Sequence, residues 1–174
     1  MNTIFKRTSV RKYTDKPITK EQTELLLKAA MAAPSARNCQ PWEFVVINKK
    51  ETLLGITDFL PNAVMLKQAP LAIAVCGNKT KISLELAEDV WAQDCAAATQ
   101  NILLEATELG LGSVWIGIYH KKHAREGLSE ILLLPDYIVP FSVIAIGYPA
   151  EKAEPKDKFN KQKIHYEKWS GVKE

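Results

Sequence analysis

The stretch that organises the chain runs from Glu85 to Gly117 and reads ELAEDVWAQDCAAATQNILLEATELGLGSVWIG. From Glu85 to Leu109 it contains neither Gly nor Pro, and it is rich in Ala, Leu, Glu and Gln, which favour helices. Gly110 stands where helices commonly end in a left-handed residue. We therefore expect one long helix over 85–109, then a glycine turn and a strand over 113–118.

The polar residues of this expected helix form one narrow stripe, at Asp94, Asn101, Glu105 and Glu108. The rest of its surface is largely apolar, which is wider than the single buried stripe of a surface helix. Since a chain of this size offers one core, the second apolar face is expected to meet a partner chain, and the small residues over 95–98 favour close helix contact. The alternative is a central helix surrounded by its own chain.

Composition limits the classes of protein that the chain can represent. Its 174 residues are 47% hydrophobic, which is enough for one domain over 1–174 with a core that needs no disulfide. The three cysteines are widely separated and predict inert thiols rather than a disulfide or metal framework. The 23 basic and 20 acidic residues are too balanced to indicate nucleic acid binding.

Targeting signals are also missing from the sequence. No apolar run is long enough to span a bilayer, and the first residues lack the apolar stretch of a signal peptide. We therefore expect a cytoplasmic protein without a membrane partner.

Apolar segments alternate with helical ones along the chain. The expected strands are 43–47, 71–77, 113–118 and 141–147, and the expected further helices are 20–33, 49–59 and 120–132, with a helical piece to Gln68. This order predicts a sheet covered on both faces, in an α/β or α+β sandwich. Of the two we expect α+β: a three-layer α-β-α sandwich around a central mixed sheet of about four to five strands. From about residue 150 the chain is polar and rich in Lys and Pro, which indicates an extended C-terminal arm.

Two polar segments are candidates for binding a ligand. The first, RTSVRKY over 7–13, places Arg7, Ser9 and Arg11 on one face if it is extended, and guanidinium groups with hydroxyls suit a phosphate. The second, APSARNCQPW over 33–42, holds short polar side chains between two prolines. The alternatives are a solvated basic turn and a plain connecting loop.

No recognised catalytic motif is present. The chain lacks a nucleophile elbow and a P-loop, and its Gly110-Leu111-Gly112 lacks the third glycine of a dinucleotide fingerprint. His120 and His123 form the only histidine pair and have two lysines between them, so no metal site is predicted. Residue chemistry thus favours a bound cofactor that supplies the reactivity.

Four motifs in order resemble the nitroreductase family. They are RTSVRKY over 7–13, APSARNCQPWEF over 33–44, the segment from Asp94 through QNILL to GLGSVWIG at Gly117, and IGYP over 146–149. The resemblance covers residues 4 to about 169. It implies an FMN-dependent oxidoreductase that is an obligate homodimer, with two flavins in the subunit interface.

The resemblance also implies which residues bind FMN. The phosphate, ribityl chain and pyrimidine edge of FMN would be bound by Arg7, Thr8, Ser9 and Arg11. The other subunit would supply Pro34, Ser35, Ala36 and Asn38. Asn62 is similar to the family's flavin-contacting Asn, and Trp115, Ile116 and Gly117 would line a ring face with amides near N5 and O4. The best matches for two basic residues that complete the phosphate site are Lys156 and Lys158.

The implied reaction uses NADH or NADPH to reduce the flavin, after which a nitroaromatic or quinone acceptor enters the same slot in a ping-pong mechanism. No side chain need be an obligatory acid or base, so no catalytic residue is named. The chain departs from longer members in having little room for helices over 49–68, and in having lysine at 156 and 158, where arginine is common.

Three other functions remain open at this point. The same flavin fold can act on another acceptor, by dehalogenation or flavin reduction. A flavin-binding module without turnover would bind FMN that neither NADH nor NADPH reduces. A basic α/β binding domain would bind no cofactor at all.

Overall fold

The computed structural model describes residues 2–82 and 89–169. Its sheet has four strands in the order β1-β2-β4-β3. The strands are β1 (Trp42–Ile47), β2 (Leu71–Asn78), β3 (Gly112–Gly117) and β4 (Ile138–Gly147). The predicted strand number is confirmed, but the predicted mixed pairing is wrong for these strands, because each neighbouring pair is antiparallel. Parallel pairing is found in an isolated bridge between Ser9 and Ser113.

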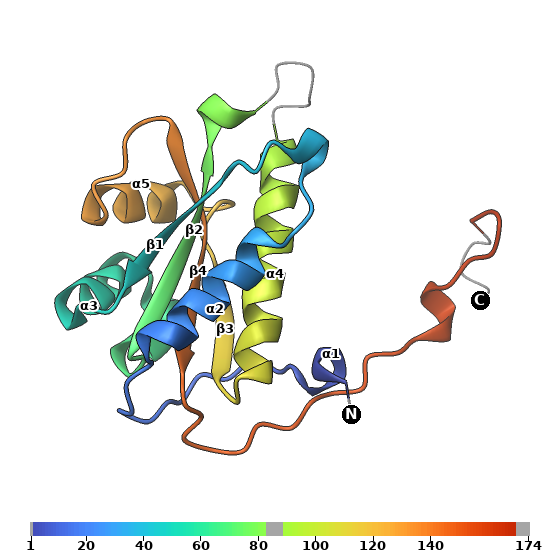
Figure 1. Cartoon of the computed structure of the whole chain (residues 1–174), viewed down its shortest axis with the longest axis horizontal. Helices are drawn as coiled ribbons and strands as arrows, with labels where there is room; N and C mark the ends of the chain where they lie inside the picture. The colour runs from blue at the N-terminus through green and yellow to red at the C-terminus, as the bar shows by residue number, and fades with distance from the viewer. Residues whose placement is uncertain (1, 83–88, 170–174) are drawn as a thin grey trace.

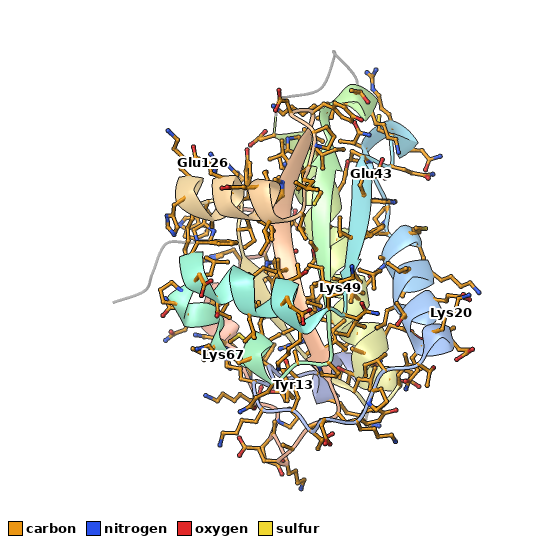
Figure 2. The ribbon with its side chains drawn as sticks, turned by 90° about the vertical axis from the view of Figure 1, so that its left-hand side faces the viewer. Tyr13, Lys20, Glu43, Lys49, Lys67 and Glu126 are labelled. Atoms are coloured by element: carbon orange, nitrogen blue, oxygen red, sulfur yellow. The ribbon has the colours of Figure 1, made fainter. Side chains whose placement is uncertain are left out.

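Helices cover both faces of the sheet, which confirms the α+β sandwich (Figure 1). On one face lie α2 (Lys20–Met31) and α4 (Val90–Glu108), and on the other α3 (Lys50–Phe59) and α5 (Lys122–Ile131). Viewed from the side that carries α3 and α5, Lys49 next to α3 lies in front of the strands, and Lys20 of α2 lies to their right (Figure 2). The shorter pieces are α1 (Thr3–Lys6), η1 (Ala36–Asn38), η2 (Pro61–Lys67), η3 (Lys79–Lys81) and η4 (Lys161–Lys163).

The core has two parts, one on each face of the sheet. Every residue of β2 is buried, and alternate side chains of a strand point to opposite faces. Ala72, Ala74 and Cys76 therefore join the cluster under α3 and α5. Leu71, Ile73 and Val75 join the cluster under α2 and α4. The central strands are thus covered on both sides.

The end of α4 follows the sequence closely. Gly110 has φ of 71°, the left-handed conformation expected of a glycine just beyond a helix. The amide of Leu111 donates to the carbonyl of Ala106 at 2.7 Å, and the amide of Gly110 donates to that of Thr107 at 3.2 Å. These two bonds form a Schellman motif, which turns the chain from α4 into β3.

The start of α4 differs from the expected position at Glu85. Asp89 has φ of −104° and ψ of 2° and precedes the first helical residue, Val90. The expected helical residues 85–88 lie outside the described part of the chain. At α2, Thr19 and Gln22 form a capping box, because the side chain of each accepts a hydrogen bond from the other's backbone amide.

β4 begins at Ile138, three residues before the expected strand start at Phe141. Pro140 favoured the later strand start, because proline has no backbone N–H to donate to a neighbouring strand. The pairing register of β2 with β4 shifts between Val75 and Cys76, so that Cys76 lies opposite Pro140 and Val75 opposite Ser142. This irregularity accommodates the proline inside the strand.

The C-terminal arm extends away from the sheet (Figure 1). Ala153 still packs on the core. Beyond it, Phe159, Tyr166 and Trp169 expose 70%, 83% and 78% of their surface. Such a group of exposed aromatic side chains is typical of a surface that binds another molecule.

Candidate functional site

The N-terminal basic segment lies against the edge strand β3. The amide of Val10 donates to the carbonyl of Ser113 at 3.0 Å. Val10 is buried over Gly112, where an added Cβ would lie 2.7 Å from the Val10 side chain. Because Val10 points inward, its neighbours Ser9 and Arg11 point outward, and Arg11 is exposed. The segment is therefore fastened by its backbone and Val10, with its polar groups displayed.

Tyr13 fixes the other end of this segment, a role that the sequence did not reveal. Its hydroxyl donates to the Val10 carbonyl at 2.6 Å, with the Ala145 carbonyl 3.1 Å away. Burial raises the pKa of Tyr13. The amide of Thr14 donates to the Tyr148 carbonyl at 2.9 Å. Residues 10–14 are thus held between β3 and the turn after β4.

The outer edge of β3 presents backbone groups for binding. In a strand, the amide and carbonyl of one residue point to the same side, and successive residues alternate. Ser113 bonds Val10 and so faces outward, whereas Ile118 donates to Phe141 on the β4 side. By this alternation, Trp115 and Gly117 also turn their amides to the outer edge. This edge therefore has unpaired backbone groups, and the contact of its amides with a flat ligand stays a prediction.

The second polar segment lies at the other end of α4. The amide of Ala36 donates to the carboxylate of Asp94 at 3.0 Å. The amide of Gln40 donates to the Ser35 hydroxyl at 3.0 Å, and its side chain donates to Asn38 at 2.9 Å. The loop therefore has a defined shape with its polar groups near the surface.

These two segments lie far apart within one chain. The hydroxyl of Thr3 in α1 donates to the carboxylate of Glu108, which places residues 3–9 at the C-terminal end of α4. Asp94, which binds the loop at Ala36, lies at the N-terminal end. Fourteen residues of helix separate Asp94 from Glu108, a rise of about 21 Å. One chain therefore does not join Arg7, Thr8 and Ser9 to Pro34, Ser35, Ala36 and Asn38.

Asn62 lies on the side of the sheet that carries α3. It is exposed in η2, and its neighbour Ala63 is buried in the same cluster as Val10 and Val114. Ile116 packs against this cluster too. The structure thus groups Asn62 with the N-terminal segment and β3, and not with the loop over 34–38.

Lys156 and Lys158 are not joined to the basic segment. Both are exposed in the arm, and neither forms a hydrogen bond or an ion pair within residues 2–82 and 89–169. Where the arm leaves the body, it runs below α1 (Figure 1).

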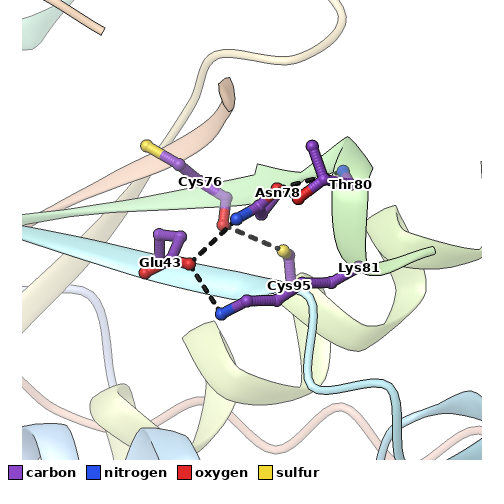
Figure 3. A network of polar contacts seen from close by, with 6 residues as sticks. All are labelled: Glu43, Cys76, Asn78, Thr80, Lys81 and Cys95. Carbon is purple, nitrogen blue, oxygen red and sulfur yellow. Dashed lines mark hydrogen bonds and ion pairs between the residues drawn. The ribbon is translucent and has the colours of Figure 1, made fainter. Parts of the chain in front are cut away.

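A polar network lies where β1 begins and β2 ends, and it adds no reactive group to the site (Figure 3). Glu43 accepts hydrogen bonds from Lys81 at 2.7 Å and from Asn78 at 3.1 Å, and the Lys81 bond lowers the pKa of the Glu43 carboxyl. Burial raises the pKa of Cys76 to about 12 and also raises the pKa of Cys95. These two thiols are inert, as predicted, whereas Cys39 is only half-buried.

The exposed groups fit an anionic, flat cofactor. Arg7 and Arg11 form no ion pair within the described residues, so their guanidinium groups remain available to a phosphate. The Ser113 hydroxyl, next to the segment, is buried and has no hydrogen-bond partner there. Two guanidinium groups, hydroxyls and an edge of amides together suit the phosphate, ribityl and ring of FMN. The described residues contain no group of three side chains able to hold a metal ion.

The fold is an α+β sandwich with helices on both faces of one sheet, and comparison with known proteins gives its family. The model of the Nitroreductase family matches residues 4–64 and 59–148. The chain therefore belongs to the nitroreductase family, which confirms the resemblance stated above.

Individual relatives agree with this assignment. A protein of Archaeoglobus fulgidus, provisionally named NADH dehydrogenase/NAD(P)H nitroreductase, is 46% identical over 95% of this chain and 96% of its own. The Bacillus subtilis "FMN reductase [NAD(P)H]" is 30% identical over 96% and 74%. The solved "FMN-dependent Nitroreductase" of Clostridium difficile has a TM-score of 0.88 and 33% identity over 97% of this chain and 99% of that one.

Within the described residues, no helix is long and apolar enough to cross a membrane.

Proposed function

We propose that this protein is an FMN-dependent oxidoreductase that uses NADH or NADPH to reduce nitroaromatic or quinone-type acceptors. The bound FMN supplies the hydride-accepting and hydride-donating chemistry. NAD(P)H and the acceptor occupy the same slot in turn, in a ping-pong mechanism. The family assignment supports this function. Dependence on NAD(P)H fits a cytoplasmic location. The chain acts as one flavin-binding domain.

The observation that carries the proposal is the separation of the two polar segments along α4. A single flavin contacts both segments only if they come from different chains. The working unit is therefore a homodimer with two flavins in its interface, related by a two-fold axis. The exposed aromatic residues of the arm supply further surface for the second copy.

Each group of residues has a distinct task at the flavin. Arg7, Thr8, Ser9 and Arg11 bind the phosphate, ribityl and pyrimidine parts, and Asn62 contacts the ring from the same side. The amides of the Trp115, Ile116 and Gly117 strand donate toward the reacting edge of the ring and stabilise negative charge there. The loop with Pro34, Ser35, Ala36 and Asn38 of the second copy excludes water from the ring.

The arm completes the phosphate site in this proposal. Lys156 and Lys158 reach a phosphate only when the arm is docked, because neither contacts Arg7 or Arg11 within one chain. Lysine contributes a point charge there and not a bidentate fork. A phosphate of about −2 charge offsets most of the formal charge of +3 per chain.

An absorbance spectrum of the purified protein, before and after NADPH or NADH, tests the function. We expect a yellow protein whose flavin bands bleach on anaerobic addition of a nicotinamide and return on addition of a nitroaromatic or quinone. Flavin that neither nicotinamide bleaches would indicate a binding module without turnover. A protein that stays colourless after addition of FMN would contradict the proposal.

Flavin reduction is the second candidate, and the relative named FMN reductase favours it. Bleached protein that regains its colour with free FMN, but not with nitro or quinone compounds, would support this candidate.

Mixed dimers test the shared site. One chain carries Arg11→Ala and the other Asn38→Ala, so a site built from two chains leaves one flavin site intact and one doubly defective. We expect the mixed dimer to bind one FMN with wild-type affinity. Two sites that each carry a single defect, neither with wild-type affinity, would show that each flavin contacts residues of one chain only.

A further inference from the structure

Two polar side chains of α4 bind the backbone that leads into the cofactor loop. The side-chain amide of Asn101 donates to the Ala29 carbonyl near the end of α2 at 3.0 Å. The carboxylate of Asp94 accepts from the Ala36 amide at 3.0 Å. Seven residues apart, Asp94 and Asn101 lie on the same face of the helix. Part of the polar stripe in the sequence therefore faces α2 and the loop.

Burying the Asp94 carboxylate costs free energy. Only 8% of Asp94 is exposed, and no Lys, Arg or His of the described chain forms an ion pair with it. Burying a charge is unfavourable unless hydrogen bonds compensate it. The bond from the Ala36 amide is of the charge-assisted type, which is stronger than a bond between neutral groups.

The loop that Asp94 binds is conformationally strained. Arg37, Asn38 and Gln40 have φ values of 52°, 56° and 47°, a region that residues other than glycine rarely adopt. Such conformations persist only when the surroundings impose them. The bond from Ala36 to Asp94 is the link by which α4 imposes the path of this loop, just before its strained residues.

We propose that Asp94 is a positioning residue for cofactor binding: it holds the loop over 35–38 so that its hydroxyl and amide groups are presented to the flavin of the second copy. Asn101 fixes the helix end from which the loop departs. This inference rests on the proposed function, because it takes the loop to contact FMN.

Four variants separate positioning from general stability. Asp94→Ala removes the acceptor, Asp94→Asn retains a neutral acceptor, and Ala36→Pro removes the donor at a first-turn position that tolerates proline. Asp89→Asn is the matched control, since Asp89 is exposed at the same helix end and forms no side-chain cap bond. Each is measured for FMN dissociation constant, visible circular dichroism of bound FMN, and sedimentation.

We expect Asp94→Ala to weaken FMN binding about tenfold or more, the equivalent of one charged hydrogen bond, and to alter the circular dichroism of the bound flavin. Asp94→Asn should recover most of the affinity, and Asp89→Asn should match wild type. Adding Ala36→Pro to Asp94→Ala should cause little further loss, because both changes remove the same bond.

Two failures are distinguishable. Wild-type protein that binds no FMN would overturn the proposed function together with this inference. Wild-type protein that binds FMN, while the Asp94→Ala and Ala36→Pro variants bind it within twofold and with unchanged circular dichroism, would overturn only the role of Asp94. If Asp94→Ala does not fold, the Ala36→Pro result decides.

Discussion

Arg11 and Lys12 are adjacent basic residues with different surroundings. Lys12 forms an ion pair with Glu151 at 2.8 Å, whereas Arg11 forms none among the residues described. We expect Arg11→Ala to weaken FMN binding by about 1.5–3 kcal/mol, the usual contribution of a charge-assisted hydrogen bond. Fluorescence titration of the apoprotein with FMN measures this change.

Lys12→Ala is the control for that titration, because it removes a neighbouring charge that is already paired at the surface. Its effect should be under about 1 kcal/mol, as for exposed ion pairs. Unchanged FMN affinity in Arg11→Ala would remove Arg11 from the site.

The Cys76 thiol makes the stability of the fold sensitive to alkaline pH. Its pKa is raised by burial from 9.0 to about 12, so the folded protein keeps a proton that the unfolded chain releases. The resulting stability is complete below about pH 9 and is lost as pH rises from there toward 12, at up to about 1.4 kcal/mol per pH unit. Urea unfolding at a series of pH values measures the slope.

Cys76→Ala should reduce this slope but not abolish it, because burial also raises the pKa of Cys95, and the cavity lowers the free energy of unfolding at every pH. Cys39→Ala provides the comparison, since Cys39 is only half-buried. Equal slopes in wild type and Cys76→Ala would show that the buried thiol does not contribute.

Residue types in the site were readable from sequence, but their partners were not. Arg7, Ser9 and Arg11 stand in a short motif, so their shared face follows from alternation. Tyr13 and Asp94 act through residues 132 and 58 positions away, at Ala145 and Ala36. No local pattern indicates such contacts, and their roles appear only once the chain is folded.

Among the elements, α4 shows what the sequence can and cannot predict. Its composition and its terminal glycine predicted a long helix and the place where it ends. The residues buried within one chain, among them Trp91, Cys95, Ile102 and Ala106, share one face of the helix, so burial of a second face stays a prediction. The opposite face of α4, called the outward stripe here, contains Gln93, Ala97 and Gln100. It is less apolar than expected, because Gln93 and Gln100 are exposed and Ala97 is half-buried.

The sheet was predicted as mixed for an identifiable reason. Strands with continuous apolar runs, separated by helices, are typical of parallel sheets covered on both faces. Here β2 and β4 are covered on both faces although they pair antiparallel. Continuous burial therefore reports the two helical layers and not the direction of the neighbouring strand.

Ala97→Glu tests whether the outward stripe of α4 pairs with a second copy. A charge at the centre of a helix contact stays unpaired and costs several kcal/mol, so we expect monomers without flavin. Sedimentation with detection of flavin absorbance measures both outcomes at once.

Leu54→Glu is the matched control, because it places the same charge on an exposed residue of α3, on the opposite face of the sheet. It should remain a flavin-loaded dimer. The same result for Ala97→Glu would show that α4 does not pair as proposed.

The whole molecule has a body and an arm that contribute differently to stability. Phe159, Gln162 and Ile164 form hydrogen bonds to other residues of the arm, whereas the body contains both parts of the core. Ending the chain after Ala153 should therefore leave a folded body with unchanged far-ultraviolet circular dichroism.

The same truncation should abolish the dimer and weaken FMN binding at least tenfold, since it removes the exposed aromatic residues together with Lys156 and Lys158. Gel filtration and FMN titration measure these losses. A truncated chain that remains a flavin-loaded dimer would assign the arm no part in the site.

The central claim is that two chains together build each flavin site. Sedimentation velocity recorded at 280 nm and at 450 nm, on the protein as purified with FMN, tests it most directly. We predict that the flavin absorbance sediments with a particle of twice the chain mass of 19.5 kDa, at one FMN per chain. Flavin that sediments with the single chain would contradict the claim.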